Sequence, residues 1–218
     1  MSADEPVDPR TPSMKDVFEY VYWKEFWGKG SGEGSTIANT RPYVDFLHRF
    51  LKRMDIKSVV DLGCGDWQFS ETIAWGDIRY RGYDVAVKLV AANQQRHGRP
   101  NISFHTIEDD FSVLPEADLL IVKDVMQHWP HKAIHRFRPM LERYRHVLIT
   151  NCVAPRGKTD NVDILLGEFR PLDLRRPPFA WPLTEVCRYA VPRPWWRRLK
   201  PPAWRKSVLL YRRPDAPS

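Results

Sequence analysis

The sequence predicts an α/β fold, in which a mostly parallel, Rossmann-like sheet is flanked by helices. Three observations predict it. From Ser58 onward, short apolar strands alternate with segments of helical periodicity. The first of these strands ends in a glycine-rich turn at residues 63–65. Residues 117–123 form a nearly continuous apolar run, which is typical of a strand buried on both faces of a sheet.

The N-terminal part of the chain predicts a helical cap over residues 14–57. Residues 1–13 are acidic and contain proline, so we expect a disordered lead. A helix is expected over residues 14–27, and a second over residues 41–54, where Pro42 falls in the first turn. The glycine-rich residues 28–35 between them are expected to form a flexible lid over a ligand site, although a simple linker has the same composition.

The remaining residues, 58–218, are expected to form the main domain. Strands are predicted over residues 58–62, 79–84, 102–107, 117–123 and 146–150, and helices over residues 67–75, 86–97 and 130–144. After Asn151 the alternation stops. Residues 184–191 and 207–212 are expected to pair as an antiparallel hairpin, which holds a basic, Trp-rich insertion at residues 192–206.

The positive charge is concentrated in the last third of the chain. The protein has a formal net charge of +7, and residues 151–218 carry 14 Lys and Arg against 6 Asp and Glu. Tryptophan and basic side chains together favour an anionic membrane surface, a phosphorylated glycan or single-stranded RNA, although charge runs are often only solvated surface. We expect residues 193–206 to contact an anionic membrane surface, with nucleic acid as the less favoured partner.

The ends of the chain and its cysteines indicate a cytoplasmic protein. No stretch approaches the roughly 20 apolar residues of a membrane helix. The N-terminus lacks the basic start and apolar stretch of a signal peptide. Cys64, Cys152 and Cys187 are far apart and odd in number, so we expect reduced, buried thiols rather than a disulfide framework. A location at the inner face of the membrane would follow from the contact expected above.

The turn after the first predicted strand is the strongest motif. In residues 61–66, Asp-Leu-Gly-Cys-Gly-Asp, the glycines allow the backbone to approach a ligand closely. Asp84 ends the next strand, 19 residues after Gly65, where an acid suits the two hydroxyls of a ribose. A dinucleotide site would require a small residue at position 68, which is Gln68. Asp61 and Asp66 would also repel a pyrophosphate, whereas they suit a ligand that carries an ammonium group.

These residues resemble the cofactor motifs of class I S-adenosylmethionine-dependent methyltransferases. Residues 61–66 resemble the first motif of that superfamily, Asp84 its ribose-binding acid, and residues 118–124 its fourth strand. Glu108 and Asp109 match the positions on the adenine side, although a solvated acidic turn has the same pattern. The resemblance implies S-adenosylmethionine as the cofactor. Including Ser31 of the lid, the residues expected to bind it are Ser31, Asp61, Gly63, Cys64, Gly65, Asp66, Asp84, Val85, Glu108, Asp109 and Lys123.

A second resemblance points to the acceptor. Residues 27–36, 123–128 and 161–179 are similar to a group of small bacterial methyltransferases associated with saccharide and natural-product biosynthesis. This resemblance implies methyl transfer to a hydroxyl of a sugar or small molecule, and residues 170–179 are expected to face that acceptor. Residues 177–179, Pro-Pro-Phe, resemble the motif of base N-methyltransferases, but that motif belongs directly after the fourth strand. We therefore do not predict base methylation.

His128 is the predicted catalytic residue. It follows the fourth strand, at the edge of the sheet where ligands bind, and histidine accepts a proton near neutral pH. Asp124 is the second candidate, since it could orient His128, take the proton or bind the cofactor. His131 and His135 have the i, i+4 spacing of metal ligands, but the sequence offers no third ligand, so no metal site is predicted. Two alternatives stay open, an RNA methyltransferase and a non-catalytic cofactor-binding module.

Overall fold

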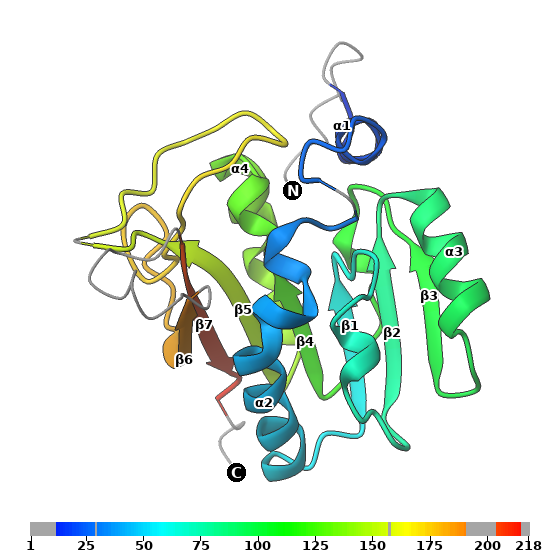
Figure 1. Cartoon of the computed structure of the whole chain (residues 1–218). Helices are drawn as coiled ribbons and strands as arrows, with labels where there is room; N and C mark the ends of the chain where they lie inside the picture. Colours follow the sequence, from blue (N-terminus) through cyan, green and yellow to red (C-terminus); the bar gives the residue numbers. More distant parts are fainter. Residues whose placement is uncertain (1–11, 29, 157, 191–203, 215–218) are drawn as a thin grey trace, which may run out of the picture.

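The computed structural model describes residues 12–28, 30–156, 158–190 and 204–214. It contains one seven-stranded sheet with the order β3-β2-β1-β4-β5-β7-β6 (Figure 1). The strands are β1 (Ser58–Leu62), β2 (Arg79–Asp84), β3 (Ile102–Thr106), β4 (Leu119–Lys123), β5 (His146–Val153), β6 (Thr184–Ala190) and β7 (Arg205–Arg212). Strands β1 to β5 pair in parallel, and β7 lies antiparallel between β5 and β6. The predicted fold class, including the C-terminal antiparallel strands, is confirmed.

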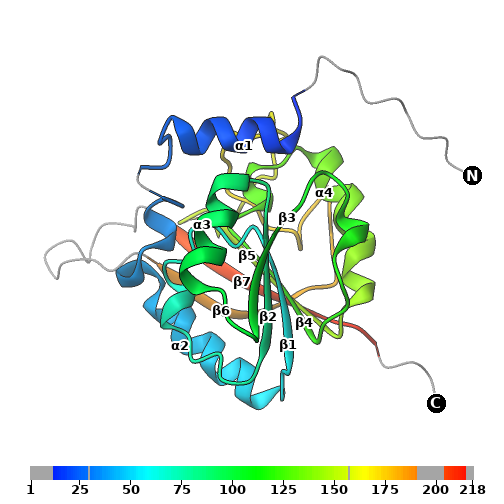
Figure 2. The same ribbon diagram turned by 90° about the vertical axis from the view of Figure 1, so that its right-hand side faces the viewer.

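Four α-helices accompany the sheet: α1 (Met14–Trp23), α2 (Ile37–Arg53), α3 (Val87–His97) and α4 (His131–Phe137). Helices α2 and α3 cover one face and α4 covers the other, while α1 crosses the carboxyl ends of the strands (Figures 1 and 2). None of the helices in the described residues is long and apolar enough to span a bilayer.

Strand β4 shows how the apolar run in the sequence builds the core. All five of its residues are buried. Leu119 and Ile121 pack in the cluster under α2, whereas Leu120 and Val122 pack in the cluster under α4. Because successive side chains of a strand point to opposite faces, a central strand covered on both sides must be apolar throughout.

The helix predicted over residues 67–75 is wrong. The chain instead forms turns and one short 3-10 helix, Ser70–Thr72. Trp67 has a positive φ of 55° and is 3% exposed, and its ring packs against Tyr80, His97 and Phe104. Burial of this large ring draws the backbone out of helical geometry. The glycine-rich turn is therefore not followed by a helix N-terminus.

Several other predicted boundaries move. Helix α1 ends at Trp23, four residues early, because Glu25 turns the backbone to a φ of 52°. Helix α2 begins at Ile37, a turn earlier than predicted, so Pro42 lies inside it. The helix predicted over residues 130–144 is α4 followed by a 3-10 helix, Arg138–Arg143, with a proline at its start.

Two predicted segments lie largely outside the described residues. Of the lead, only Pro12 and Ser13 are described, and Ser13 caps α1 by accepting a hydrogen bond from the Asp16 backbone N–H. Of the basic, Trp-rich insertion, only residues 204–206 are described. Cys64, Cys152 and Cys187 are all unpaired.

Candidate active site

A cavity of about 410 Å³ lies at the carboxyl ends of β1, β2 and β4, beneath α1. Ligands in open α/β sheets bind at this edge. Ten of the residues predicted from the sequence line the cavity: Ser31, Asp61, Gly63, Cys64, Gly65, Asp84, Val85, Lys123, Asp124 and His128. Aromatic side chains form much of the remaining wall, among them Trp27, Phe69, Phe111, Trp129, Phe169 and Trp204. A mostly apolar wall with a few convergent polar groups is typical of a small-molecule site.

The glycine-rich turn brings backbone directly onto the cavity. Gly63 and Gly65 both have positive φ angles, 74° and 57°. A Cβ on Gly63 would lie 2.2 Å from Val125 Cγ2, and one on Gly65 would lie 2.3 Å from Ser31 Oγ. Only glycine satisfies both the backbone conformation and the available space.

Asp84 is held beside this turn from the end of β2. It is 6% exposed and accepts hydrogen bonds from the backbone N–H groups of Gly65 (3.0 Å) and Ala86 (3.1 Å). Burial raises the pKa of Asp84, and the two backbone hydrogen bonds oppose that rise. A carboxylate oxygen has two lone-pair sites, so each oxygen keeps acceptor capacity for a hydroxyl.

Asp61 lies deeper, in strand β1. It accepts a hydrogen bond of 2.6 Å from the Tyr80 hydroxyl. Burial raises its pKa to about 6, although the Tyr80 hydrogen bond acts in the opposite direction. Asp61 thus lines the cavity and also accepts a hydrogen bond from Tyr80, a side chain of β2.

Asp66, Glu108 and Asp109 do not line the cavity. Asp66 forms two hydrogen bonds with the lid, and we call this pair of bonds the Ser31–Asp66 clasp. Its carboxylate accepts a hydrogen bond from the Ser31 backbone N–H (3.1 Å), and its own backbone N–H donates to Ser31 Oγ (2.8 Å). Asp109 accepts from the backbone N–H of Met14 at the start of α1 (3.3 Å), where an acid complements the helix dipole. Glu108 is exposed.

The glycine-rich segment predicted as a lid forms one wall of the cavity. Ser31 through Ser35 line it. Two contacts hold the segment in place: the Ser31–Asp66 clasp and a hydrogen bond of 3.1 Å from Lys123 Nζ to the Gly34 carbonyl. Polar contacts therefore hold the lid to the turn after β1 and to the end of β4.

Asp124 has a positive φ of 62° and lies between two lysines. Its carboxylate oxygens are 2.7 Å from Lys123 Nζ and 2.5 Å from Lys206 Nζ. Burial acts to raise its pKa, but the two ammonium groups hold the pKa at about 2. The sequence did not identify Lys206, which belongs to the segment expected at a membrane surface. The side chain of Lys206 is only 3% exposed and faces the cavity together with Trp204. The prediction that these two residues contact a membrane surface is therefore wrong.

His128 ends a short 3-10 helix, Met126–His128, directly after β4. Its Nδ1 lies 2.9 Å from the Glu168 carbonyl, which can only accept, so Nδ1 carries the proton. Its Nε2 lies 3.3 Å from the Gln127 amide nitrogen. The Gln127 amide is oriented by the Cys152 backbone N–H, which donates to Oε1 at 2.8 Å. The lone pair of His128 therefore lies on Nε2, where it accepts a hydrogen bond from the Gln127 amide N–H.

The surroundings of His128 keep it neutral. The ring is flanked by Trp27, with centroids 4.8 Å apart, and by Phe169, at 5.8 Å. Burial lowers the pKa of His128 to about 4. The sequence placed Trp27 on a helix and did not single out Phe169; both reach the cavity only because chain segments far apart in the sequence meet there.

Other expected contacts lie elsewhere. Residues 170–179 do not line the cavity, and Leu172 and Leu174 from this segment are buried in the core under α4. The His131 and His135 rings pack against Phe179. Within the described ranges, no three His, Cys, Asp or Glu side chains are grouped as metal ligands.

Comparison with known proteins identifies the family. Residues 39–171, more than half of the chain, match the sequence model of the O-methyltransferase domain. Magnesium protoporphyrin IX methyltransferase from Synechocystis PCC 6803, solved with bound SAM, is a structural match at 16% identity, 95% coverage of this chain, 100% of that chain and a TM-score of 0.59.

N-methyltransferase NodS from Bradyrhizobium japonicum WM9, solved with S-adenosyl-L-homocysteine, also has 16% identity and a TM-score of 0.59, with 83% and 90% coverage. The methyltransferase domain of bacterial CtHen1 has 15% identity and a TM-score of 0.55, with 79% and 98% coverage. Identities this low establish a shared fold. No curated protein matches the sequence. The chain belongs to the O-methyltransferase domain family, which confirms the predicted membership of the class I S-adenosylmethionine-dependent methyltransferases.

Proposed function

We propose that the protein transfers a methyl group from S-adenosylmethionine to a hydroxyl of a small-molecule or sugar acceptor. The observation that carries this proposal is a single cavity that holds both a ribose-type acid, Asp84, and a neutral His128 with its lone pair on Nε2. The family match to O-methyltransferase domains supports oxygen as the acceptor atom.

The residues of the cavity fit the cofactor. Asp84 would accept hydrogen bonds from the ribose hydroxyls, and Val85, Ile107 and Phe111 offer an apolar wall to the adenine. The turn at Gly63 and Gly65 leaves no room for a side chain, as a closely approaching ligand requires. Lys123 supplies an ammonium group for the α-carboxylate.

His128 and its neighbours would carry the acceptor chemistry. S-adenosylmethionine supplies an electrophilic methyl on a sulfonium. The acceptor hydroxyl would displace the Gln127 N–H from His128 Nε2. It would pass its proton to Nε2, and then to solvent, as the new C–O bond forms, and S-adenosylhomocysteine would be the other product. Asp124 is a poor base, because both of its oxygens face ammonium groups and its pKa is about 2. We therefore assign the proton to His128, and assign to Asp124 the placement of Lys123 and Lys206.

Most of the rate enhancement is assigned to alignment. An aligned nucleophile in a closed site gains about 7–11 kcal/mol over the reaction in solution. Trp27 and Phe169, whose rings both contact His128, offer ring faces against which the acceptor can pack. Both a sugar and a planar ring present a suitable apolar face.

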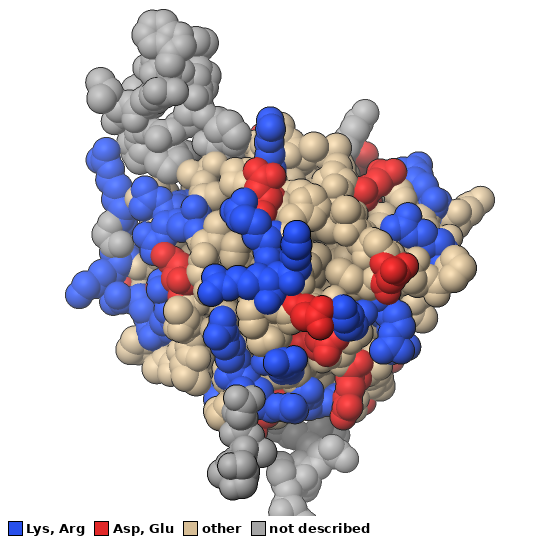
Figure 3. All heavy atoms as spheres, turned by 90° about the horizontal axis from the view of Figure 1, so that it is seen from below, with Lys and Arg blue, Asp and Glu red and all other residues tan. Residues whose placement is uncertain are grey.

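Among the residues that the structure describes, the distribution of exposed charge does not favour RNA as the acceptor. Lys and Arg gather on the side of the molecule seen from below (Figure 3). Exposed basic residues lie at the amino ends of the parallel strands, among them Lys52, Arg53, Arg79, Arg145 and Arg212. This edge is opposite the one that carries the cavity, so a polyanion bound there would lie away from His128.

Contact with an anionic membrane remains a proposal from the sequence. Trp195, Trp196, Arg197 and Arg198 would carry it, and they lie outside the described residues. We expect the protein to co-sediment with anionic but not neutral vesicles, since each basic residue near such a surface contributes about 1 kcal/mol. Absence of sedimentation with either vesicle would remove both the membrane contact and the peripheral location.

Substitution of Asp84 tests the cofactor site. Asp84→Ala is expected to weaken binding of S-adenosylmethionine by about 1–3 kcal/mol, because the ribose hydroxyls lose their acceptor. Asp84→Asn keeps an acceptor oxygen and is expected to lose less. Calorimetric titration gives the affinities, and urea unfolding shows whether loss of the Gly65 hydrogen bond has disturbed the turn. Wild-type affinity in Asp84→Ala would remove Asp84 from the site.

A further inference from the structure

Arg170 is a buried cation whose guanidinium group is only partly bonded. The residue is 2% exposed. Its Nη1 donates to the Trp129 carbonyl at 2.7 Å, while Nε and Nη2 are buried without a hydrogen-bond partner among the described residues. No carboxylate in the described ranges forms an ion pair with it. Burial lowers the pKa of Arg170, and attraction to the Asp163 carboxylate, which forms no direct ion pair with it, only partly opposes this. A buried charge without a direct ion pair opposes folding, so stability alone does not account for an arginine at this position.

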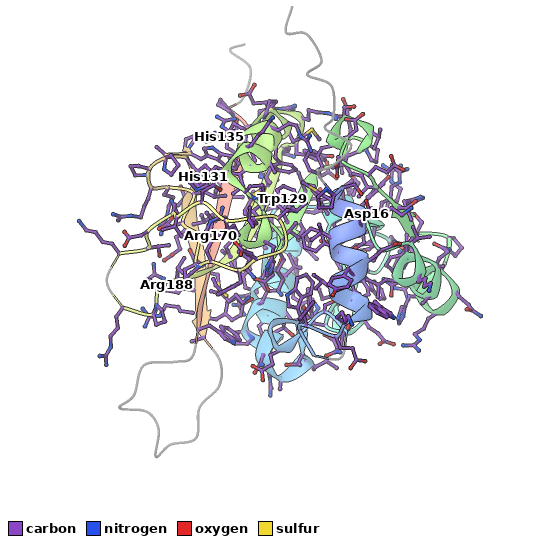
Figure 4. The ribbon with its side chains drawn as sticks, turned by 90° about the horizontal axis from the view of Figure 1, so that it is seen from above. Asp16, Trp129, His131, His135, Arg170 and Arg188 are labelled. Carbon is purple, nitrogen blue, oxygen red and sulfur yellow. The ribbon has the colours of Figure 1, made fainter. Side chains whose placement is uncertain are left out.

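The contacts of Arg170 centre on the loop that carries His128. Its backbone N–H donates to the Gln127 carbonyl at 3.2 Å, and its side chain reaches the Trp129 carbonyl. Arg170 therefore bonds the residues immediately before and after His128. Figure 4 shows Arg170 and Trp129 in one region beside α4, where the segment after β5 crosses.

The same segment bonds His128 itself. The Gly167 N–H donates to the His128 carbonyl at 2.9 Å, and the Glu168 carbonyl accepts from His128 Nδ1. Residues 167–170 thus form hydrogen bonds with the backbone on both sides of His128 and also with its ring. The 3-10 helix that ends at His128 has only three residues, so it provides little rigidity of its own.

We infer that Arg170 is a positioning residue that fixes the backbone of the His128 loop, and with it the direction of the Nε2 lone pair. This inference rests on the proposed role of His128. The planar guanidinium holds a carbonyl in a fixed direction, which a flexible lysine does not do as well. Rate depends steeply on such placement, since a displacement of about 1 Å can lower turnover about 100-fold.

The positive charge of Arg170 gives the test a second signal. Arg170 also helps to lower the pKa of His128, together with burial. Arg170→Met removes both the Nη1 hydrogen bond to Trp129 and the charge, whereas Arg170→Lys keeps the charge but loses the planar guanidinium group. A purely electrostatic role predicts that Arg170→Met makes His128 a stronger base without slowing the reaction. Positioning predicts slower turnover in both variants.

The experiment combines histidine side-chain ¹⁵N NMR with steady-state kinetics on the full chain. In Arg170→Met we expect a higher His128 pKa, a kcat lowered about 10- to 100-fold, and an unchanged affinity for S-adenosylmethionine. In Arg170→Lys we expect an unchanged pKa and a smaller loss of kcat. Arg175→Met is the matched control, because Arg175 belongs to the same segment but pairs with Asp173 and Glu185.

The outcomes separate this inference from the proposed function. Wild-type kcat in Arg170→Met would overturn it, whether or not the His128 resonances change. If the wild-type protein transfers no methyl group, the proposed function fails. The NMR arm then decides the inference: loss in Arg170→Met of the Nδ1–H tautomer, which bonds the Glu168 carbonyl, supports it, and an unchanged tautomer overturns it. If Arg170→Met does not fold, the test passes to Arg170→Lys: a lower kcat at unchanged pKa supports the inference, and wild-type kcat overturns it.

Discussion

Replacement of His128 by alanine is expected to lower turnover by about 10²–10⁴, while affinity for S-adenosylmethionine stays close to wild type. Nε2 is the only ring nitrogen with a lone pair for a proton, because Nδ1 carries the proton that it donates to the Glu168 carbonyl. Its removal leaves the acceptor proton to water. Methyl transfer from labelled cofactor to an acceptor that the wild type methylates measures the loss.

The pH dependence of turnover should also reflect the role of His128 as the base. Because burial lowers the pKa of His128 to about 4, the imidazole stays neutral from neutral pH down into the acidic range. The loss of activity that His128 causes is thus expected as the pH drops through about 4, instead of near the ordinary value of about 6.5 that the sequence alone implies. A fall near pH 6 would belong to Asp61, whose pKa is about 6. His128→Ala should lack this acidic limb.

His131→Ala and His135→Ala are matched controls for His128→Ala. Both histidines lie on α4, and neither lines the cavity. They should keep wild-type turnover and the acidic limb. An equal loss of cofactor affinity in His128→Ala would mean that His128 is structural, and unchanged turnover would assign the proton to another group or to water.

Replacement of Asp124 is expected to destabilise the fold by about 3–5 kcal/mol, because it removes the carboxylate that two buried ammonium groups share. Lys123 and Lys206 are 4% and 3% exposed at their side chains. Asp124→Ala also places alanine at a φ of 62°, which adds backbone strain of about 1–2 kcal/mol. Asp124→Asn tolerates that φ, so it isolates the loss of charge. Urea unfolding at pH 7 gives the free energies.

The pKa of Asp124 also predicts how stability depends on pH. Its folded value, about 2, lies below the unfolded value of about 3.9. The contribution of the cluster is therefore fully present above about pH 4, and it is lost as the pH falls toward 2. Asp124→Asn should show a flatter decline over this range.

A double variant provides the control for the charge cluster. In Lys206→Met, Asp124 keeps its ion pair with Lys123, so this variant should lose less stability than Asp124→Asn. Combining the two substitutions removes one of the stranded ammonium groups and should recover part of the loss. Equal free energies of unfolding for Asp124→Asn and wild type would show that solvent already screens the charges of the cluster.

The strands and the glycine-rich turn could be predicted because their determinants are local. An apolar run such as β4 and a turn at Gly63 and Gly65 depend on side-chain patterning and on backbone freedom. The predicted helix over residues 67–75 failed for a non-local reason. Trp67 fits into an aromatic cluster with residues from three other elements, and its burial outweighs the helical periodicity of the neighbouring residues.

The residues that surround Asp124 and His128 in the cavity also could not be predicted from the sequence. Lys206 lies 82 residues after Asp124 and reaches it only because β7 inserts beside β5. Trp27 and Phe169 come from a turn and a connecting segment without regular structure. A basic residue at the start of a C-terminal strand was the one available signal for Lys206, and surrounding basic residues masked it.

A crystal structure with S-adenosylhomocysteine tests the central claim most directly. We expect the ribose hydroxyls on Asp84, the adenine between Val85 and Phe111, and the sulfur facing the space beside His128 Nε2. Density for the ligand outside this cavity, or an empty cavity at saturating ligand, would contradict the proposed cofactor site and with it the assignment of His128.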